Sequence, residues 1–136
     1  MTDVALQITP SVPQRVRELV AEALARDISE VSIDSVLMSD LGAESLDFLD
    51  IVFKLEHEFR IQITRGEMER AARGDMTDEE FAPQGVISAA GLARLRELIP
   101  EASGRIQPGL RPAQILSLFS VQTLVNLVVA KQKANG

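Results

Sequence analysis

Residues 40–47 read Asp40-Leu41-Gly42-Ala43-Glu44-Ser45-Leu46-Asp47, and this stretch decides how the rest of the chain is interpreted. It places a serine three residues after a glycine, where an amphipathic helix is expected to begin. A phosphate joined to a serine in that position would lie near free backbone N–H groups and the positive end of the helix dipole. Gly42 adds little steric bulk, so a modifying enzyme can approach the backbone closely. An isolated serine before an apolar helix is, however, more often only an N-cap.

The helix that follows the serine is expected to span residues 45–59. Its apolar side chains are too many for one narrow stripe, so part of its apolar surface is expected to stay exposed for a partner. We assign the later residues to the core and the earlier ones to the centre of a partner contact. The core set is Val52, Leu55 and Phe59, and the contact set is Leu46, Leu49 and Phe53. His57 is expected to be a surface residue of this helix.

The rest of the chain also shows helical spacing, and strand-type alternation persists nowhere. A first helix is expected from Ser11 to about residue 26, followed by a long connection over residues 27–44. Ile28, Val31, Ile33, Val36 and Leu37 are expected to pin this connection to the core. The sequence therefore predicts an all-α fold.

Thr64, Thr77, Ser88 and Ser120 are expected to cap further elements downstream of residue 63. We expect a capped helix over 65–73, a turn or short helix after Thr77, a helix over 89–99, a loop over 100–112, a short helix to about 118 and a last helix over 121–131. In the helix over 89–99, Leu92, Leu95, Leu98 and Ile99 are predicted to face inward.

Composition and charge exclude several classes of function. The 136 residues include no cysteine and one histidine, which excludes disulfides, thiolate metal sites and multi-histidine metal sites and leaves no catalytic constellation. A net charge of −6 argues against nucleic-acid binding. Residues 40–64 carry six acids against two bases, which favours basic partners. No signal peptide or membrane span is apparent, so we expect a soluble cytoplasmic protein. Because the sequence offers no catalytic constellation, we do not expect an enzyme.

The motif around Ser45 resembles the phosphopantetheine attachment motif of acyl carrier proteins, Asp-x-Gly-x-Asp-Ser-Leu-Asp/Glu. Residues 50–63 are also similar to the second helix of that family and its exit, and residues 121–125 are similar to the start of its last helix. The resemblance covers residues 11–64 and 113–132. It implies an acyl-carrier-like four-helix bundle, with extra helices inserted between the second and last core helices.

The resemblance implies a covalent 4′-phosphopantetheine arm, transferred from coenzyme A to Ser45 by a phosphopantetheinyl transferase. Asp40, Gly42 and Leu46 complete the attachment site in this interpretation. Enzymes with basic patches that load, elongate or transfer acyl groups would be the other partners of a monomeric carrier. The residues expected to meet them are Glu44, Asp47, Leu49, Asp50, Phe53 and Glu58.

Two departures from the family pattern are visible. Glu44 stands where the family usually has aspartate, a conservative change. Residues 65–112 form a much longer connection to the last helix than the family has, so we expect one carrier domain, residues 1–136, with an inserted helical segment. Either 65–73 or 113–118 replaces the short third helix of the family. The insertion suggests either a specialised role, with a long or unusual acyl chain or a dedicated partner, or a stabilising appendage.

Two alternatives to a fatty-acyl or lipid carrier remain at this point. A peptidyl or polyketide carrier shares the fold and the arm. A helical interaction module whose serine is never modified would share the fold alone.

Overall fold

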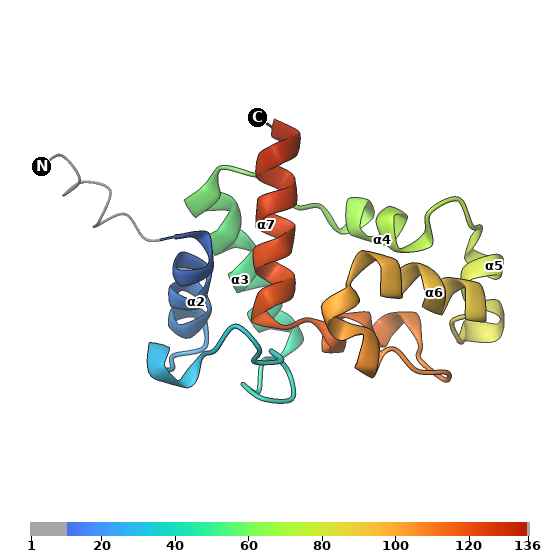
Figure 1. The fold of residues 1–136 in the computed structure, drawn as a ribbon, viewed down its shortest axis with the longest axis horizontal. Coiled ribbons are helices and arrows are strands. Elements are labelled where there is room, and N and C mark those ends of the chain that lie inside the picture. Colours follow the sequence, from blue (N-terminus) through green and yellow to red (C-terminus); the bar gives the residue numbers. More distant parts are fainter. Residues whose placement is uncertain (1–10, 136) are drawn as a thin grey trace, which may run out of the picture.

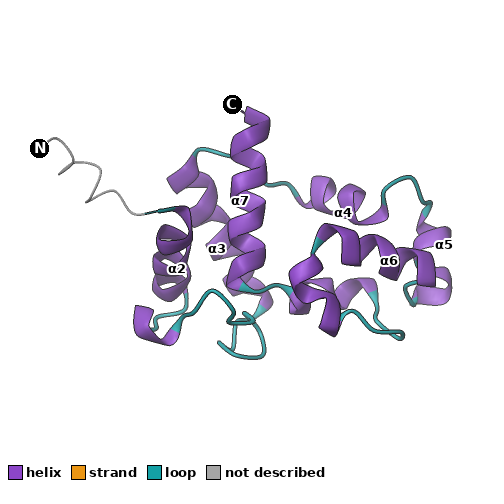
Figure 2. Ribbon diagram, viewed as in Figure 1, coloured by secondary structure: helices purple, strands orange, loops and turns teal. Residues whose placement is uncertain are grey.

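The computed structural model describes residues 11–135, which fold into helices joined by loops, and this part of the chain contains no strand (Figure 2). Figure 1 shows two groups of helices lying side by side. We call residues 11–63 with 119–135 the first lobe and residues 64–118 the second lobe. Each lobe has its own cluster of buried apolar side chains. The expectation of an all-α fold is confirmed.

Helix α2 (Val12–Ala23) opens the first lobe. The Ser11 hydroxyl accepts a hydrogen bond from the Gln14 N–H, and Pro13 lies in the first turn, where a proline has no N–H to lose. The helix ends three residues before the predicted position because Ala25 takes a left-handed conformation, with φ of 54°. The Arg26 N–H then donates to the Ala21 carbonyl, which is the bond of a Schellman ending.

The connection over residues 27–44 is pinned to the core, as predicted. It contains the 3₁₀ turn η1 (Ile28–Glu30), and Val31, Val36 and Leu37 are buried. Its middle runs antiparallel to the segment before the last helix, with Val36 opposite Ser120. The Leu37 N–H donates to the Phe119 carbonyl, and the Val121 N–H donates to the Ser35 carbonyl, both at 3.0 Å.

Helices α3 (Ser45–Phe59) and α7 (Val121–Asn135) pack against α2 to complete the first lobe. The bounds of α3 are those predicted, and α7 extends four residues beyond the prediction. Ser120 caps α7 as expected, since its hydroxyl accepts from the Thr123 N–H at 3.3 Å. The largest fully buried side chains of this lobe come from all three helices and the connection, namely Val16, Val20, Val31, Leu37, Ile51, Leu55, Val121, Leu124 and Val128.

The second lobe is a small helical unit with a core of its own. Its elements are α4 (Arg65–Arg73), α5 (Asp78–Phe81), η2 (Pro83–Gly85), α6 (Ala89–Leu98), η3 (Pro100–Arg105) and η4 (Pro112–Leu118). The predicted caps Thr64, Thr77 and Ser88 are all confirmed. Its buried cluster is Ala72, Phe81, Ile87, Leu92, Leu95, Ala102, Ile106 and Leu118.

Two expectations for this lobe are wrong. Residues 100–105 form η3 rather than loop, since Pro100 fits the first turn of a 3₁₀ helix, where a missing N–H costs nothing. Leu98 is 38% exposed rather than inward, because α6 ends there and the chain turns inward only at Ile99.

Arginine side chains hold the irregular segments of the second lobe. Arg94 donates to the Ala71 carbonyl, Arg96 donates to the Ile106 carbonyl at 2.7 Å, and Arg105 donates to the Leu118 carbonyl at 2.8 Å. Each bond satisfies a carbonyl that no helix ladder would pair. The lobe thus compensates for its small core with side-chain bonds to its backbone.

The two lobes meet along α7 and η4. Lys131 of α7 pairs with Glu67 of α4, and Asn126 of α7 donates to Glu101 of η3. Ile115 of η4 packs against both apolar clusters. Of the two segments proposed to replace the third helix, η4 contacts the core of the first lobe, whereas Ala72 of α4 belongs to the core of the second.

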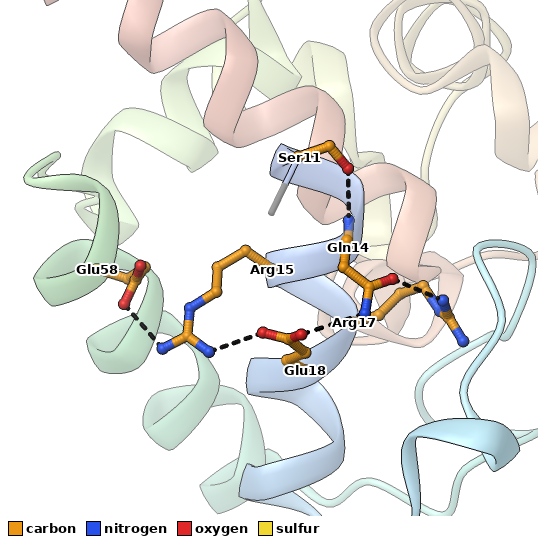
Figure 3. A network of polar contacts seen from close by, with 6 residues as sticks. All are labelled: Ser11, Gln14, Arg15, Arg17, Glu18 and Glu58. Atoms are coloured by element: carbon orange, nitrogen blue, oxygen red, sulfur yellow. Dashed lines mark hydrogen bonds and ion pairs between the residues drawn. The ribbon is translucent and has the colours of Figure 1, made fainter. Parts of the chain in front are cut away.

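A polar network joins α2 to α3 (Figure 3). The Arg15 guanidinium donates to Glu18 on its own helix at 2.9 Å and to Glu58 on α3 at 3.0 Å. These hydrogen bonds from Arg15 are the main reason that the pKa of each carboxyl lies below its ordinary value. Arg17 points the other way, where it donates to the carbonyls of Val31 and Ile28.

We predict that this network makes the stability of the first lobe depend on acid pH. A lowered carboxyl pKa in the folded state stabilises the protein above the ordinary carboxyl range, and that stability is lost as the pH falls through the folded pKa. Urea unfolding should therefore show Arg15→Gln less stable than the wild type at pH 7, with the difference shrinking toward pH 3. Arg17→Gln, which loses bonds to uncharged acceptors only (Gln14, Ile28 and Val31), should show the same loss at both pH values. A pH-independent difference for Arg15→Gln would contradict this account.

We also predict that Gly91 of α6 cannot be enlarged. A Cβ there would lie 2.7 Å from Ile87 Cγ2 and 3.0 Å from the carbonyl oxygen of Phe81. The clash outweighs the roughly 1 kcal/mol that alanine gains over glycine inside a helix. Gly91→Ala should lower the free energy of unfolding by about 1 kcal/mol in urea. The control Gly104→Ala places its Cβ in open space and should be neutral or stabilising; an equal gain from both variants would refute the prediction.

Candidate functional site

A tight turn over residues 36–43 leads into α3. The Asp40 carboxylate accepts from the Val36 N–H at 2.7 Å, and the Gly42 N–H donates to the Met38 carbonyl at 3.1 Å. Gly42 has φ of +72°, a left-handed conformation that a side chain would strain. The Ala43 N–H then donates to the Leu37 carbonyl at 2.9 Å, and Ala43 is buried. Glycine is thus required here for its conformation.

Ser45 does not serve as the N-cap of α3. Glu44 is the N-cap residue, and Ser45 is the first residue of the helix. The Asp47 carboxylate reaches back to accept from the Glu44 N–H at 2.7 Å, as the acidic partner of a capping box does. The interpretation of Ser45 as the N-cap is therefore wrong. Its side chain is exposed, and of the N–H groups in the first turn those of Asp47 and Phe48 donate to the Glu44 carbonyl, whereas those of Ser45 and Leu46 precede the first helical bond.

An exposed apolar row continues from Ser45 along α3. Leu46 is 77% exposed, Leu49 is 56% exposed and Phe53 is 65% exposed. Their spacing of three and four residues places them on one face of the helix. The opposite face, with Phe48, Ile51 and Leu55, is buried. As expected, Leu55 lies in the core, and Val52 and Phe59 pack against it partly buried.

The acids predicted to meet partners fall into two groups. Glu44 and Asp50 are exposed near Ser45, and Asp50 lies 4.0 Å from Lys54 at the limit of an ion pair. Asp47 is close to Ser45 as well but is engaged in the cap. Glu58 lies at the other end of α3, where Arg15 holds it. Asp40 and Gly42 thus lie in the turn before α3, Glu44 to Asp47 and Asp50 lie at its start, and Glu58 lies at its far end.

Two features of the site have no signal in the local motif. The hydrogen bonds between residues 35–37 and residues 119–121 join segments more than 80 positions apart in the sequence. Arg26 extends over the turn, so that a Cβ on Gly42 would lie 4.0 Å from its Nη2 atom. His57 is exposed as expected, and the described residues hold no group of three or more His, Asp or Glu side chains placed to bind a metal.

The residues present fit a phosphate-linked arm on Ser45. Ser45 is exposed, a Cβ built on Gly42 would meet only the end of the Arg26 side chain within 4 Å, and Leu46 is 77% exposed. A phosphate there would lie at the start of a helix of 15 residues, where the dipole and the first N–H groups favour an anion. None of the described helices is long and apolar enough to cross a membrane.

Comparison with known proteins agrees with this geometry. Residues 14–72 match the family model described as phosphopantetheine attachment site. The match runs from α2 through the turn and α3 into α4. No solved structure matches the chain. Domains of this family hold 4′-phosphopantetheine covalently, receive it from a phosphopantetheinyl transferase, and serve acyl-handling enzymes without being enzymes themselves. Residues 14–72 thus match a phosphopantetheine attachment domain, and this match is consistent with the acyl carrier protein family.

Proposed function

We propose that the chain carries acyl groups as thioesters on a 4′-phosphopantetheine arm at Ser45 and presents them to enzymes of fatty-acid or lipid synthesis. The observation that carries the proposal is the release of Ser45 from capping at the start of α3. Glu44 and Asp47 make the cap, so the Ser45 hydroxyl is exposed and has no structural bond of that cap to give up. The bound arm supplies a terminal thiol for the acyl group.

The protein's own part is to display the arm and to be recognised. The first turn of α3 holds the phosphate position by its N–H groups, and the rigid turn at Gly42 fixes where the arm leaves the surface. The exposed row Leu46, Leu49 and Phe53 is the apolar centre of the partner contact. Such a small contact favours the rapid exchange of partners that a shuttle needs.

Charge is proposed to guide the same partners. Glu44 and Asp50 are exposed around Ser45 and suit enzymes with basic patches. Asp47 adds its charge from within the cap. Glu58, bound to Arg15 at the far end of the helix, contributes least to this encounter. We propose that the carrier is cytoplasmic and monomeric. A monomer leaves this face of α3 free, so that different partners can dock on it one after another.

The second lobe is proposed to adapt the carrier to a long or unusual acyl chain. It has its own core, and it joins the first lobe through η4 and the polar contacts of α7. A unit attached in this way can be added without altering the turn that displays Ser45. A stabilising appendage would have the same packing, and comparison of acyl loading with and without residues 75–110 separates the two roles.

We predict that Ser45→Ala abolishes addition of the arm. The protein is produced together with a broad-specificity phosphopantetheinyl transferase, and its intact mass is measured. The wild type should gain the mass of one phosphopantetheine, and Ser45→Ala should gain none. Ser39→Ala, which removes an exposed hydroxyl from the same loop, should be modified normally. An arm that survives in Ser45→Ala would place the attachment elsewhere, and an unmodified wild type would favour the unmodified interaction module.

We further predict that exposed acids near Ser45 speed the encounter with the transferase. The double variant Glu44→Gln/Asp50→Asn should accept the arm several-fold more slowly at low salt, because surface charges of this kind contribute about 0.2–1 kcal/mol each. The difference should fade near 0.5 M salt. Glu79→Gln/Glu97→Gln removes two exposed acids from the second lobe and should load like the wild type. Equal slowing of the two double variants would argue against a localised acidic surface.

A further inference from the structure

Arg26 is fixed close to the turn that precedes Ser45. Its backbone is held by the Schellman ending of α2, where the Arg26 N–H donates to the Ala21 carbonyl at 2.9 Å. Its side chain reaches across to the turn, since a Cβ on Gly42 would be 4.0 Å from Arg26 Nη2. A single ion pair holds the guanidinium there, with Glu30 at 4.0 Å, and both side chains are well exposed.

Most other cations of the first lobe are engaged elsewhere. Arg15 pairs with Glu18 and Glu58, and Lys54 pairs with Glu22 and lies 4.0 Å from Asp50. Arg17 donates to two backbone carbonyls, and Lys131 pairs with Glu67. Arg60 caps the far end of α3, and Lys133 lies in the last turn of α7. Arg26 is therefore a cation whose guanidinium ends beside Gly42, in the turn that precedes α3.

A cation beside this turn would offset negative charge near Ser45. Asp40, Glu44, Asp47 and Asp50 all lie within five residues of Ser45 in the sequence, so a phosphodiester on its hydroxyl adds a further negative charge to an acidic segment. The carboxylates and the phosphate would repel one another. A nearby guanidinium, whose planar group of N–H donors can bind a phosphate, would offset that repulsion. From Gly42 to Ser45 the chain spans at most about 11 Å. Rotation of the exposed Arg26 side chain can cover much of that distance.

We infer that Arg26 is a positioning residue that contacts the phosphate of the arm on Ser45 and holds the arm against the turn at Gly42. The inference rests on the proposed function, because it requires an arm at Ser45. It assigns Arg26 to the arm itself rather than to partner enzymes, whose recognition falls to the acids and the apolar row. Arg26 thereby sets the direction in which the arm leaves the protein.

The test uses the loaded full-length protein and observes the phosphate directly. The ³¹P resonance of the arm is compared in the wild type, Arg26→Gln, Arg26→Lys and the control Arg60→Gln, all loaded by the same transferase. We expect the resonance to move in Arg26→Gln, to move less in Arg26→Lys, and to stay in place in Arg60→Gln. In the wild type, the Nε–Hε signal of Arg26 should shift on loading, whereas that of Arg17 should not.

A second measurement guards against a purely structural effect of the substitution. Loading should lower the midpoint of thermal unfolding by roughly 1–4 °C more in Arg26→Gln than in the wild type, and high salt should reduce this difference. If the arm is added but its ³¹P resonance is identical in Arg26→Gln and the wild type, the inference is overturned while the proposed function stands. If no arm is added to the wild type, the proposed function itself fails.

Discussion

The hydrogen bonds between residues 35–37 and residues 119–121 constrain the rest of the first lobe. A connection of 18 residues whose one helical element is a single 3₁₀ turn would normally be free to move, and this one leads directly into the turn before Ser45. Pairing of Leu37 with Phe119 and of Ser35 with Val121 fixes its middle to the chain that starts α7. Since Ala43 also bonds to Leu37, the entry into α3 is held by the same point. The display of Ser45 therefore depends on contacts made more than 70 residues away in the sequence.

The division of α3 into two faces follows from this fixed entry. Phe48, Ile51 and Leu55 enter the core, so Leu46, Leu49 and Phe53 are left outward. Exposed large apolar residues on a small protein usually mark a contact surface. The second lobe does not cover this row, because its own apolar side chains close on themselves. The fold can thus add a lobe of more than 50 residues and still present the helix face beside the serine.

Local chemistry made much of this structure predictable. Cap residues predict where helices begin, because a side-chain oxygen that accepts from a free N–H is needed at a defined position. Thr64, Thr77 and Ser88 are examples. Non-local pairings were not predictable: nothing near Arg26 indicates Gly42, and nothing near Val36 indicates Ser120. The role of Ser45 was ambiguous from sequence because Glu44 is a rarer N-cap than serine. Only the bond from Glu44 to Asp47 shows which residue starts the helix.

The most direct test of the account is peptide mapping of the protein isolated from its own cells by tandem mass spectrometry, with and without hydroxylamine. The peptide containing Ser45 is expected to bear a phosphopantetheine, and part of it is expected to carry an acyl group that hydroxylamine releases, as it does from a thioester. The mass of that acyl group would identify the pathway. A Ser45 peptide that is unmodified in the native protein would contradict the account.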